Sequence, residues 1–512
     1  MSHNPAPVIL VGARPLTIED VLVFARGEAR PALDPQVRGR ITATQRALEA
    51  RRERGEVIYG VTTGFGDSCE TSLDPRLALE LTVNLVRFHG CGTGRTLPDE
   101  AAAAVVAVRL ATLVRGTSGV REALVERLCK LLEHRVLPVI PEEGSVGASG
   151  DLTPLSYLAA LIMGEREARY RGEELPAEVA LSRAGIAPLA LRPKESLAIM
   201  NGTSVMSALA CLAFGRARRL ARAASTLTAL ASDVLQGEAG HFDARIFEAK
   251  PHPGQALCAR WIREHLGYRP SQRRAARRVQ DRYSIRCAPH VVGVLLDALP
   301  PIRRALEIEL NGASDNPIID PETGDVLHGG NFYGGHVAYA MDGLKVAVAN
   351  VADLLDRQLA LLCSPTTSNG LPANLVSRTG HDRAAHHGFK AMQISASAMT
   401  GEALKLTMPA SVFSRSTECH NQDKVSMGTI AARDCLRILE LSERVAAIAL
   451  LATCQGVDIR GAAACREATA AVHIRVRARV PANVADRRQD RDIEAAVELL
   501  GQPAVMGTAE EP

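Results

Sequence analysis

The sequence has few aromatic residues and no large excess of either charge. Aromatic residues make up 3% of the 512-residue chain, whereas hydrophobic residues make up 46%. The core must therefore consist mainly of Ala, Leu and Val, and this composition favours helices over sheets. The formal net charge is +3, which is too close to neutral to indicate a nucleic acid or a membrane surface as the partner.

Paired cysteines and long apolar runs are also missing. The eleven cysteines form no CxxC pair, which argues against a zinc site and a disulfide framework. We therefore expect reduced thiols in a cytoplasmic protein. No apolar run approaches the roughly 20 residues of a membrane span, and the proline-broken N-terminus is too short for a secretion signal.

One local cluster of positive charge, residues 269–286, departs from this balance. Arginines within such a run usually form a solvated face. We expect this role for Arg273, Arg274, Arg277 and Arg278.

Apolar residues recur with helical spacing along most of the chain. Three segments, residues 204–237, 334–362 and 429–456, continue this pattern with few helix breakers. Helices of this length are typical of a bundle. We predict a mainly α protein in which an N-terminal domain, residues 1–220, precedes a long-helix bundle and C-terminal segment, residues 221–512.

The stretch "GSVGASGDLTP", residues 144–154, has three interpretations. It can be a glycine turn before a helix that Thr153 caps and that begins with Pro154. It can present a nucleophilic serine, but that needs G-x-S-x-G after a strand, and the frame here is G-A-S-G. It can also cyclise, because the amide nitrogen of Gly150 can attack the carbonyl of Ala148 where neither residue is bulky. Ser149 then loses water and leaves 4-methylidene-imidazol-5-one (MIO), a built-in electrophile.

The longer string "GSVGASGDLTPLSY" resembles the signature of the aromatic amino acid ammonia-lyases and the related 2,3-aminomutases. The resemblance extends from about Tyr59 to about Arg460. It implies a mainly α fold whose smaller N-terminal domain carries an MIO made from Ala148, Ser149 and Gly150, without a metal. It also implies a small aromatic amino acid as substrate and a homotetramer with shared active sites.

Two further motifs match residues that the family uses in its chemistry. In "YGVTTGFGD", Tyr59 is either a packing aromatic or the tyrosine that removes a β-proton from the substrate. An ordinary tyrosine has a pKa near ~10, so this role needs a nearby positive charge or strong hydrogen bonds. Asn201 is either a turn residue or the family's asparagine, whose amide binds the substrate carboxylate or the carbonyl of the electrophile.

The motif "VQDRYSIRCAPH" contains Gln280, Tyr283 and Arg286. The resemblance implies that Arg286 binds the substrate carboxylate, for which a planar guanidinium is suited. It implies that Tyr283 is a second catalytic tyrosine and that Gln280 contacts the substrate. Phe332 matches an aromatic residue beside the electrophile, and Asn316 is expected to be structural.

Three residues bear on which ring the protein accepts. Gln422 stands where histidine ammonia-lyases have a glutamate, and the pair Phe88–His89 is not typical of the histidine, phenylalanine or tyrosine enzymes. His89 is either structural or a partner for a phenol hydroxyl, and an apolar Phe88 beside it favours tyrosine. We therefore expect a tyrosine ammonia-lyase that releases p-coumarate and ammonia. The alternatives are a tyrosine 2,3-aminomutase, a phenylalanine or histidine ammonia-lyase, and a non-catalytic structural homologue.

Overall fold

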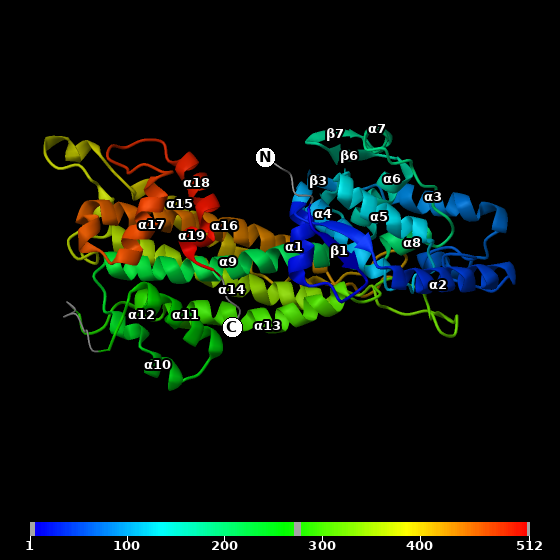
Figure 1. The fold of residues 1–512 in the computed structure, drawn as a ribbon, viewed down its shortest axis with the longest axis horizontal. Coiled ribbons are helices and arrows are strands. Elements are labelled where there is room, and N and C mark those ends of the chain that lie inside the picture. Colours follow the sequence, from blue (N-terminus) through cyan, green and yellow to red (C-terminus); the bar gives the residue numbers. More distant parts are fainter. Residues whose placement is uncertain (1–5, 271–277, 509–512) are drawn as a thin grey trace. The chain divides into compact units, whose positions relative to one another are not determined.

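The computed structural model describes residues 6–270 and 278–508 and is mainly helical, as predicted (Figure 1). Its helices are α1 (Ile18–Arg26), α2 (Pro35–Glu53), α3 (Ala78–Phe88), α4 (Asp99–Leu113), α5 (Glu122–His134), α6 (Leu152–Met163), α7 (Ala177–Arg183), α8 (Glu195–Met200), α9 (Ser204–Val234), α10 (Ala244–Glu248), α11 (Pro253–His265), α12 (Tyr283–Arg286), α13 (Ala288–Leu310), α14 (Gly335–Cys363), α15 (Lys390–Lys405), α16 (Gly428–Arg460), α17 (Glu467–Arg477), α18 (Asp490–Leu500) and α19 (Pro503–Met506). Of the four arginines expected on a solvated face, Arg278 is exposed, and the other three lie outside the described residues.

The strands are short and form small separate sheets. They are β1 (Val8–Val11), β2 (Arg30–Leu33), β3 (Thr93–Thr96), β4 (Leu137–Pro138), β5 (Pro141–Glu143), β6 (Glu167–Tyr170), β7 (Glu173–Pro176), β8 (Ile318–Ile319) and β9 (Val326–Leu327). β1 and β2 pair in parallel, with Val8 opposite Arg30. The other sheets are antiparallel, in the orders β3-β5, β4-β6-β7 and β8-β9.

The chain divides into two compact units, each built from three segments. Unit 1 comprises Met1–Gly215, Ile302–Asp342 and Pro409–Arg433, and unit 2 comprises Arg216–Pro301, Gly343–Met408 and Asp434–Pro512. The predicted domain division after residue 220 stays a prediction, since later residues contribute to both units of the structure.

The three long segments predicted as helices correspond to α9, α14 and α16. Their predicted and observed ends differ by at most four residues. A fourth long helix, α13, continues through the consecutive prolines Pro300 and Pro301.

The stretch Tyr283–Leu310 is long and apolar enough, by length and composition, to cross a membrane. No such segment is expected from the sequence, in which no apolar run approaches the length of a membrane span. Half of its most apolar window is buried inside the protein, as in the core helix of a soluble protein, so the stretch is weak support for a membrane span.

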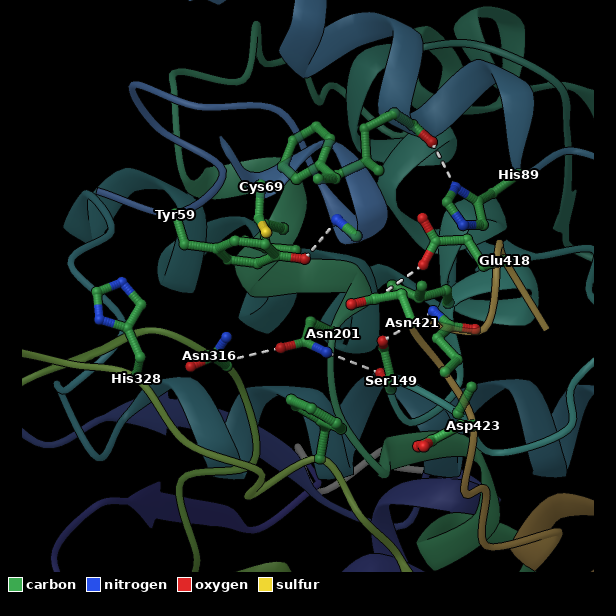
Figure 2. Close-up of a pocket in the computed structure, with 18 of the residues that line it drawn as sticks. Tyr59, Cys69, His89, Ser149, Asn201, Asn316, His328, Glu418, Asn421 and Asp423 are labelled. Atoms are coloured by element: carbon green, nitrogen blue, oxygen red, sulfur yellow. Dashed lines mark hydrogen bonds between the residues drawn. The ribbon is translucent and has the colours of Figure 1, made fainter. Parts of the chain in front are cut away.

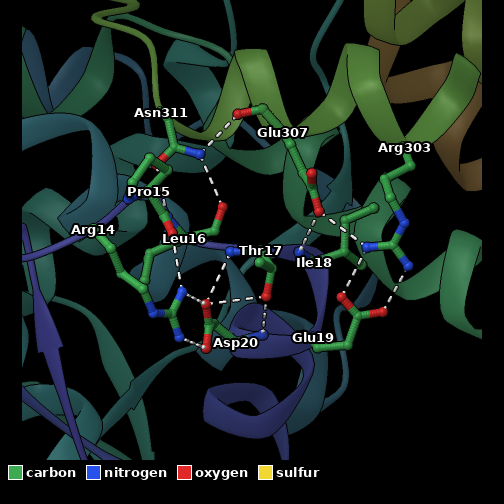
Figure 3. Close-up of polar contacts among 10 residues, drawn as sticks. All are labelled: Arg14, Pro15, Leu16, Thr17, Ile18, Glu19, Asp20, Arg303, Glu307 and Asn311. Atoms are coloured by element: carbon green, nitrogen blue, oxygen red, sulfur yellow. Dashed lines mark hydrogen bonds and ion pairs between the residues drawn. The ribbon is translucent and has the colours of Figure 1, made fainter. Parts of the chain in front are cut away.

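Segments far apart in the sequence are joined within unit 1 by polar contacts around the start of α1 (Figure 3). Thr17 and Asp20 form a capping box at the N-terminus of α1. Asn311 donates to the carbonyl of Leu16 and accepts from its amide, both at 2.8 Å. Arg303 pairs with Glu19 at 2.8 Å, so the last turns of α13 hold the start of α1.

The helix that follows the glycine-rich turn begins earlier than predicted. α6 starts at Leu152 with Asp151 at its N-cap position, so Thr153 and Pro154 both lie in its first turn. Thr153 is therefore not the cap. The Asp151 carboxylate does not cap α6 either, because it binds groups elsewhere in unit 1.

Two buried cations lie in unit 1 next to the segments that carry the candidate site. Arg109, in the buried helix α4, donates to the carbonyl of Asn201 at 2.7 Å and to the hydroxyl of Ser314 at 3.2 Å. Burial lowers the pKa of Arg109 to about 10. The Lys194 ammonium lies 2.6 Å from the Asp315 carboxylate, and both side chains are fully buried.

Replacing Lys194 by Met should strongly destabilise the protein, because Asp315 would remain as a buried charge without its ammonium partner. We expect the free energy of unfolding to fall by about 3–5 kcal/mol, measured by chemical denaturation. The double variant Lys194→Met/Asp315→Leu should recover most of this loss, because an apolar pair needs no charge partner. A double variant as unstable as the single variant would contradict this account.

Candidate active site

A cavity of about 400 Å³ in unit 1 gathers most of the residues that the sequence analysis selected (Figure 2). Its walls come from the loop after α2, the end of α3, the turn before α6, the end of α8, and the loops before α14 and α16. The lining residues are Tyr59, Phe65, Gly66, Cys69, Leu85, Phe88, His89, Ala148, Ser149, Leu152, Leu197, Asn201, Asn316, His328, Phe332, Glu418, Asn421, Gln422, Asp423 and Lys424.

The turn of Ala148, Ser149 and Gly150 packs directly against Gly202. The amide of Gly202 donates to the carbonyl of Ser149 at 3.2 Å, and the amide of Asp151 donates to the carbonyl of Gly202 at 2.8 Å. Gly150 has φ +71°, and a Cβ there would overlap the Gly202 backbone. Position 150 therefore requires glycine. Small residues on both sides of Ser149 fit the requirement for ring closure between Gly150 and Ala148.

The Asn201 side chain ties this turn to a second loop. Its Nδ2 donates to the Ser149 carbonyl at 2.8 Å, and its Oδ1 accepts from the amide of Asn316 at 2.7 Å. Of the two partners considered for Asn201, this geometry favours the carbonyl that would belong to the electrophile. Asn316 also accepts from the amide of Gly329 at 2.8 Å, which agrees with its expected structural role.

The Asp151 carboxylate lies fully buried beneath the turn. It accepts from the Ser145 hydroxyl at 3.0 Å, from the amides of Val205 and Met206 at 3.0 and 2.8 Å, and from the Thr429 hydroxyl. Burial raises the pKa of Asp151, and these hydrogen bonds oppose the shift. The carboxylate thereby joins the turn to the first residues of α9 and α16.

Gln422 contacts Ser149 directly. Its Nε2 donates to the Ser149 hydroxyl at 3.2 Å, and its Oε1 accepts from Thr417 at 3.0 Å. Both ends of the Gln422 amide therefore have partners before any substrate is considered.

Tyr59 is placed in the cavity wall by its glycine-rich loop. Its hydroxyl accepts from the amide of Gly66 at 2.8 Å. Burial raises the pKa of Tyr59, the Gly66 hydrogen bond lowers it, and the charges of Glu418 and Cys69 raise it further. Of the two influences that could make a tyrosine a base, these include one hydrogen bond, from Gly66, and no positive charge.

Phe88 and His89 end α3 at the cavity, and their ring centroids lie 4.2 Å apart. The Nδ1 of His89 lies 2.9 Å from the carbonyl of Leu85. Because a carbonyl only accepts, Nδ1 carries the proton. Burial lowers the pKa of His89, so its ring is neutral near pH 7 and Nε2 is a hydrogen-bond acceptor.

Three predicted site residues belong to unit 2, and none of them lines the cavity. Tyr283 and Arg286 are in the short helix α12, with the Arg286 guanidinium 4.7 Å from the centre of the Tyr283 ring. Arg286 donates to the carbonyl of Asp281 at 3.0 Å, and Gln280 is exposed. Their predicted roles stay predictions.

Several polar residues of the cavity were not predicted from the sequence. Glu418 accepts from the amide of Asp67 at 2.7 Å and from Asn421 at 2.8 Å, so it connects the Tyr59 loop to the Gln422 loop. Cys69, His328 and Lys424 also line the cavity. Each lies within four residues of a predicted site residue or a quoted motif: Glu418 and Lys424 near Gln422, His328 near Phe332, and Cys69 just after "YGVTTGFGD". That proximity was the available signal. Across residues 6–270 and 278–508, no three His, Cys, Asp or Glu side chains gather as metal ligands would.

Known proteins resemble this chain over nearly its whole length. A family model described as aromatic amino acid lyase matches residues 16–478. The histidine ammonia-lyase of Geobacillus thermodenitrificans is 40% identical over 501 residues, which cover 97% of this chain and 98% of that protein. The solved tyrosine aminomutase of Streptomyces globisporus is 35% identical with a TM-score of 0.90, covering 96% of each chain. The solved histidine ammonia-lyase of Trypanosoma cruzi is 34% identical with a TM-score of 0.89, covering 98% of this chain and 95% of that one.

Replacing Glu418 by Gln should lower the pKa of Tyr59, because the negative charge of Glu418 disfavours the tyrosinate. Gln keeps the size and an acceptor oxygen. We expect a decrease of about half a unit to one unit, measured by tyrosinate absorbance against the same variant carrying Tyr59→Phe. Asp423→Asn is the matched control, since this cavity carboxylate is not among the charges that raise the pKa of Tyr59. An unchanged or higher pKa in Glu418→Gln would refute the assignment.

Proposed function

Because the chain belongs to the aromatic amino acid lyase family, we propose that it eliminates ammonia from an aromatic amino acid and that its substrate is L-histidine. The observation that carries the proposal is the likeness, along almost the entire chain, to relatives named histidine ammonia-lyase. These relatives favour histidine over the tyrosine that the sequence analysis expects. The cavity is compatible with this choice, because the neutral Nε2 of His89 can accept from the N–H of an imidazole.

The chemistry uses residues that the cavity brings together. Ala148, Ser149 and Gly150 would form the MIO, which supplies an electrophile for the substrate amine. The Asn201 amide and the Gly202 amide donate to the Ser149 carbonyl and hold the turn in place. Fixed donors of this kind need no rearrangement during the reaction. Tyr59 is the proposed base for the β-proton.

Over the described ranges, the cavity of unit 1 lacks two groups that the proposed chemistry needs: a cation to bind the substrate carboxylate and a cation close to Tyr59. Among the residues that the structure describes, no arginine lines the cavity to bind a carboxylate, and no cation lowers the pKa of Tyr59. We propose, as the family resemblance implies, that Gln280, Tyr283 and Arg286 complete the site from another subunit of a homotetramer. A guanidinium brought close to Tyr59 would stabilise the tyrosinate and make the base effective near neutral pH.

L-Tyrosine is the second candidate, and Gln422 favours it. A carboxylate at this position would attract an imidazole more strongly than the neutral amide does, and the amide oxygen of Gln422 is already bound to the Thr417 hydroxyl. A phenol hydroxyl can donate to Nε2 of His89 as an imidazole can. A solved structural neighbour is a tyrosine aminomutase, so return of ammonia to the β-carbon is a further outcome for either substrate.

The substrate is tested by measuring kcat/KM for L-histidine, L-tyrosine and L-phenylalanine, with β-amino acids included among the products analysed. We expect the highest kcat/KM for histidine.

His89→Leu should shift the preference toward phenylalanine by about ten- to a hundredfold, because it removes the acceptor for a ring donor. Gln422→Glu should raise the preference for histidine over tyrosine.

Ser149→Ala serves as the inactive control, since the electrophile cannot form in it. Full activity in this variant would exclude the proposed chemistry, and the absence of turnover in the unmodified protein would favour a non-catalytic homologue. Tyrosine as the best substrate would overturn the histidine assignment and leave the second candidate.

Shared active sites predict complementation between two inactive variants. Ser149→Ala and Arg286→Ala subunits should each lack activity, whereas co-assembled mixtures should regain part of it, because some sites combine an intact Ser149 with an intact Arg286. Sedimentation should show a tetramer. A fully active monomer would contradict shared sites.

A further inference from the structure

An arginine in an unfavourable backbone conformation lies close to the end of α3. Arg166 is in the turn between α6 and β6 and has φ +65°. This left-handed region costs a residue with a side chain about 1–2 kcal/mol, and glycine would adopt it freely. A non-glycine residue persists there only where surrounding contacts hold it.

The Arg166 side chain reaches α3 and binds its last turn. Nη2 donates to the carbonyl of Val86 at 2.6 Å, and Nη1 donates to the Ser156 hydroxyl at 2.9 Å. The guanidinium lies 4.5 Å from the centre of the Tyr157 ring, a favourable cation–π distance. A Cβ at position 90 would overlap Nη2, so Gly90 leaves the space that the guanidinium occupies.

Two further contacts hold the same end of the helix. The Ser156 hydroxyl, which accepts from Arg166, shares its one proton between the Thr153 carbonyl at 2.7 Å and the His89 carbonyl at 3.2 Å, so Arg166 lies one group away from the His89 main chain. Glu165, the neighbour of Arg166, pairs with Arg87 at 2.7 Å on the surface. The main chain is therefore held on both sides of Phe88.

We propose that Arg166 is a positioning residue for the ring-selecting pair Phe88–His89. By binding the carbonyls at the end of α3, it fixes His89 so that Nδ1 donates to Leu85 and Nε2 faces the cavity as an acceptor. Arg166 touches no residue of the electrophile turn. Its effect on the choice of substrate ring rests on the proposed function, whereas its effect on His89 does not.

The electrostatics around His89 agree with this role. Burial is the main cause of the lowered pKa of His89, the Leu85 carbonyl raises it, and the positive charge of Arg166 lowers it. The charged or ionisable groups that act on Arg166 are Tyr157, Glu165, Glu167 and Cys91, and Glu165 also pairs with Arg87 on the surface. Glu418 lines the same cavity as His89. A cation beside the imidazole disfavours its protonation, so Arg166 helps to keep Nε2 free to accept.

The protein contains a matched control in the next turn along the chain. Arg171, between β6 and β7, also has a positive φ, +53°, and its guanidinium also lies over a tyrosine, 5.1 Å from the centre of the Tyr170 ring. Arg171 is exposed, and neither it nor Tyr170 lines the cavity. Glycine suits the backbone at both positions, so Arg166→Gly and Arg171→Gly should both fold.

The first readout is the titration of His89, followed by NMR on ¹³C-histidine-labelled protein and assigned with His89→Gln. Arg166→Gly should raise the pKa of His89 by on the order of half a unit to one unit, whereas Arg171→Gly should not change it. This measurement needs no substrate, so it remains valid if the proposed function is wrong. An unchanged His89 titration in Arg166→Gly would overturn the proposal.

The second readout is ring selectivity. Arg166→Gly should lower the kcat/KM preference for a donor-bearing ring over phenylalanine by about three- to tenfold, which corresponds to weakening one neutral hydrogen bond. The activity toward phenylalanine should change little, because the electrophile turn is untouched. An equal loss with all three amino acids, or the same change in Arg171→Gly, would show that Arg166 acts only on general stability and would refute the positioning role.

Discussion

The close approach of two backbone turns, at Gly150 and at Gly202, is the constraint on which the rest of the candidate site depends. Gly150 has no room for a Cβ because the Gly202 backbone lies against it, and Gly202 has none because Arg109 and Ser314 lie against it. The contact fixes the Ser149 carbonyl between two donors, the side-chain amide of Asn201 and the main-chain N–H of Gly202. The same residues that could form an electrophile are thus held rigidly before any chemistry begins.

Buried charged side chains bind the segments that make this contact. Arg109 binds the carbonyl of Asn201, and Asp151 joins the turn to the starts of α9 and α16. Asp315, which pairs with Lys194, is the residue directly before Asn316. Each of these groups would be costly to bury alone, and each has hydrogen-bond partners that reduce the cost. A network of this kind allows few alternative arrangements, so it keeps the residues of the site close to the geometry that the reaction needs.

The candidate site combines this rigid part with groups borne on loops. Tyr59 and Gln422 belong to two loops that Glu418 connects, whereas His89 is held at a helix end by the turn that contains Arg166. Under the proposed function, a ring with a hydrogen-bond donor would be preferred to a bare phenyl ring, because Nε2 of His89 can accept. The choice between imidazole and phenol depends on smaller differences, chiefly on the amide of Gln422.

The sequence by itself determined the helical class, the three longest helices and the motifs whose residues meet in the cavity. Apolar periodicity and glycine-rich strings are local features, so they can be read without knowing the fold. Only the tertiary structure decided what holds these residues. Asp151 replaces Thr153 at the start of α6, Glu418 joins two loops, and Arg166 reaches α3 across 80 positions of sequence. Such contacts depend on which distant segments pack together, and no local pattern of residues encodes that pairing.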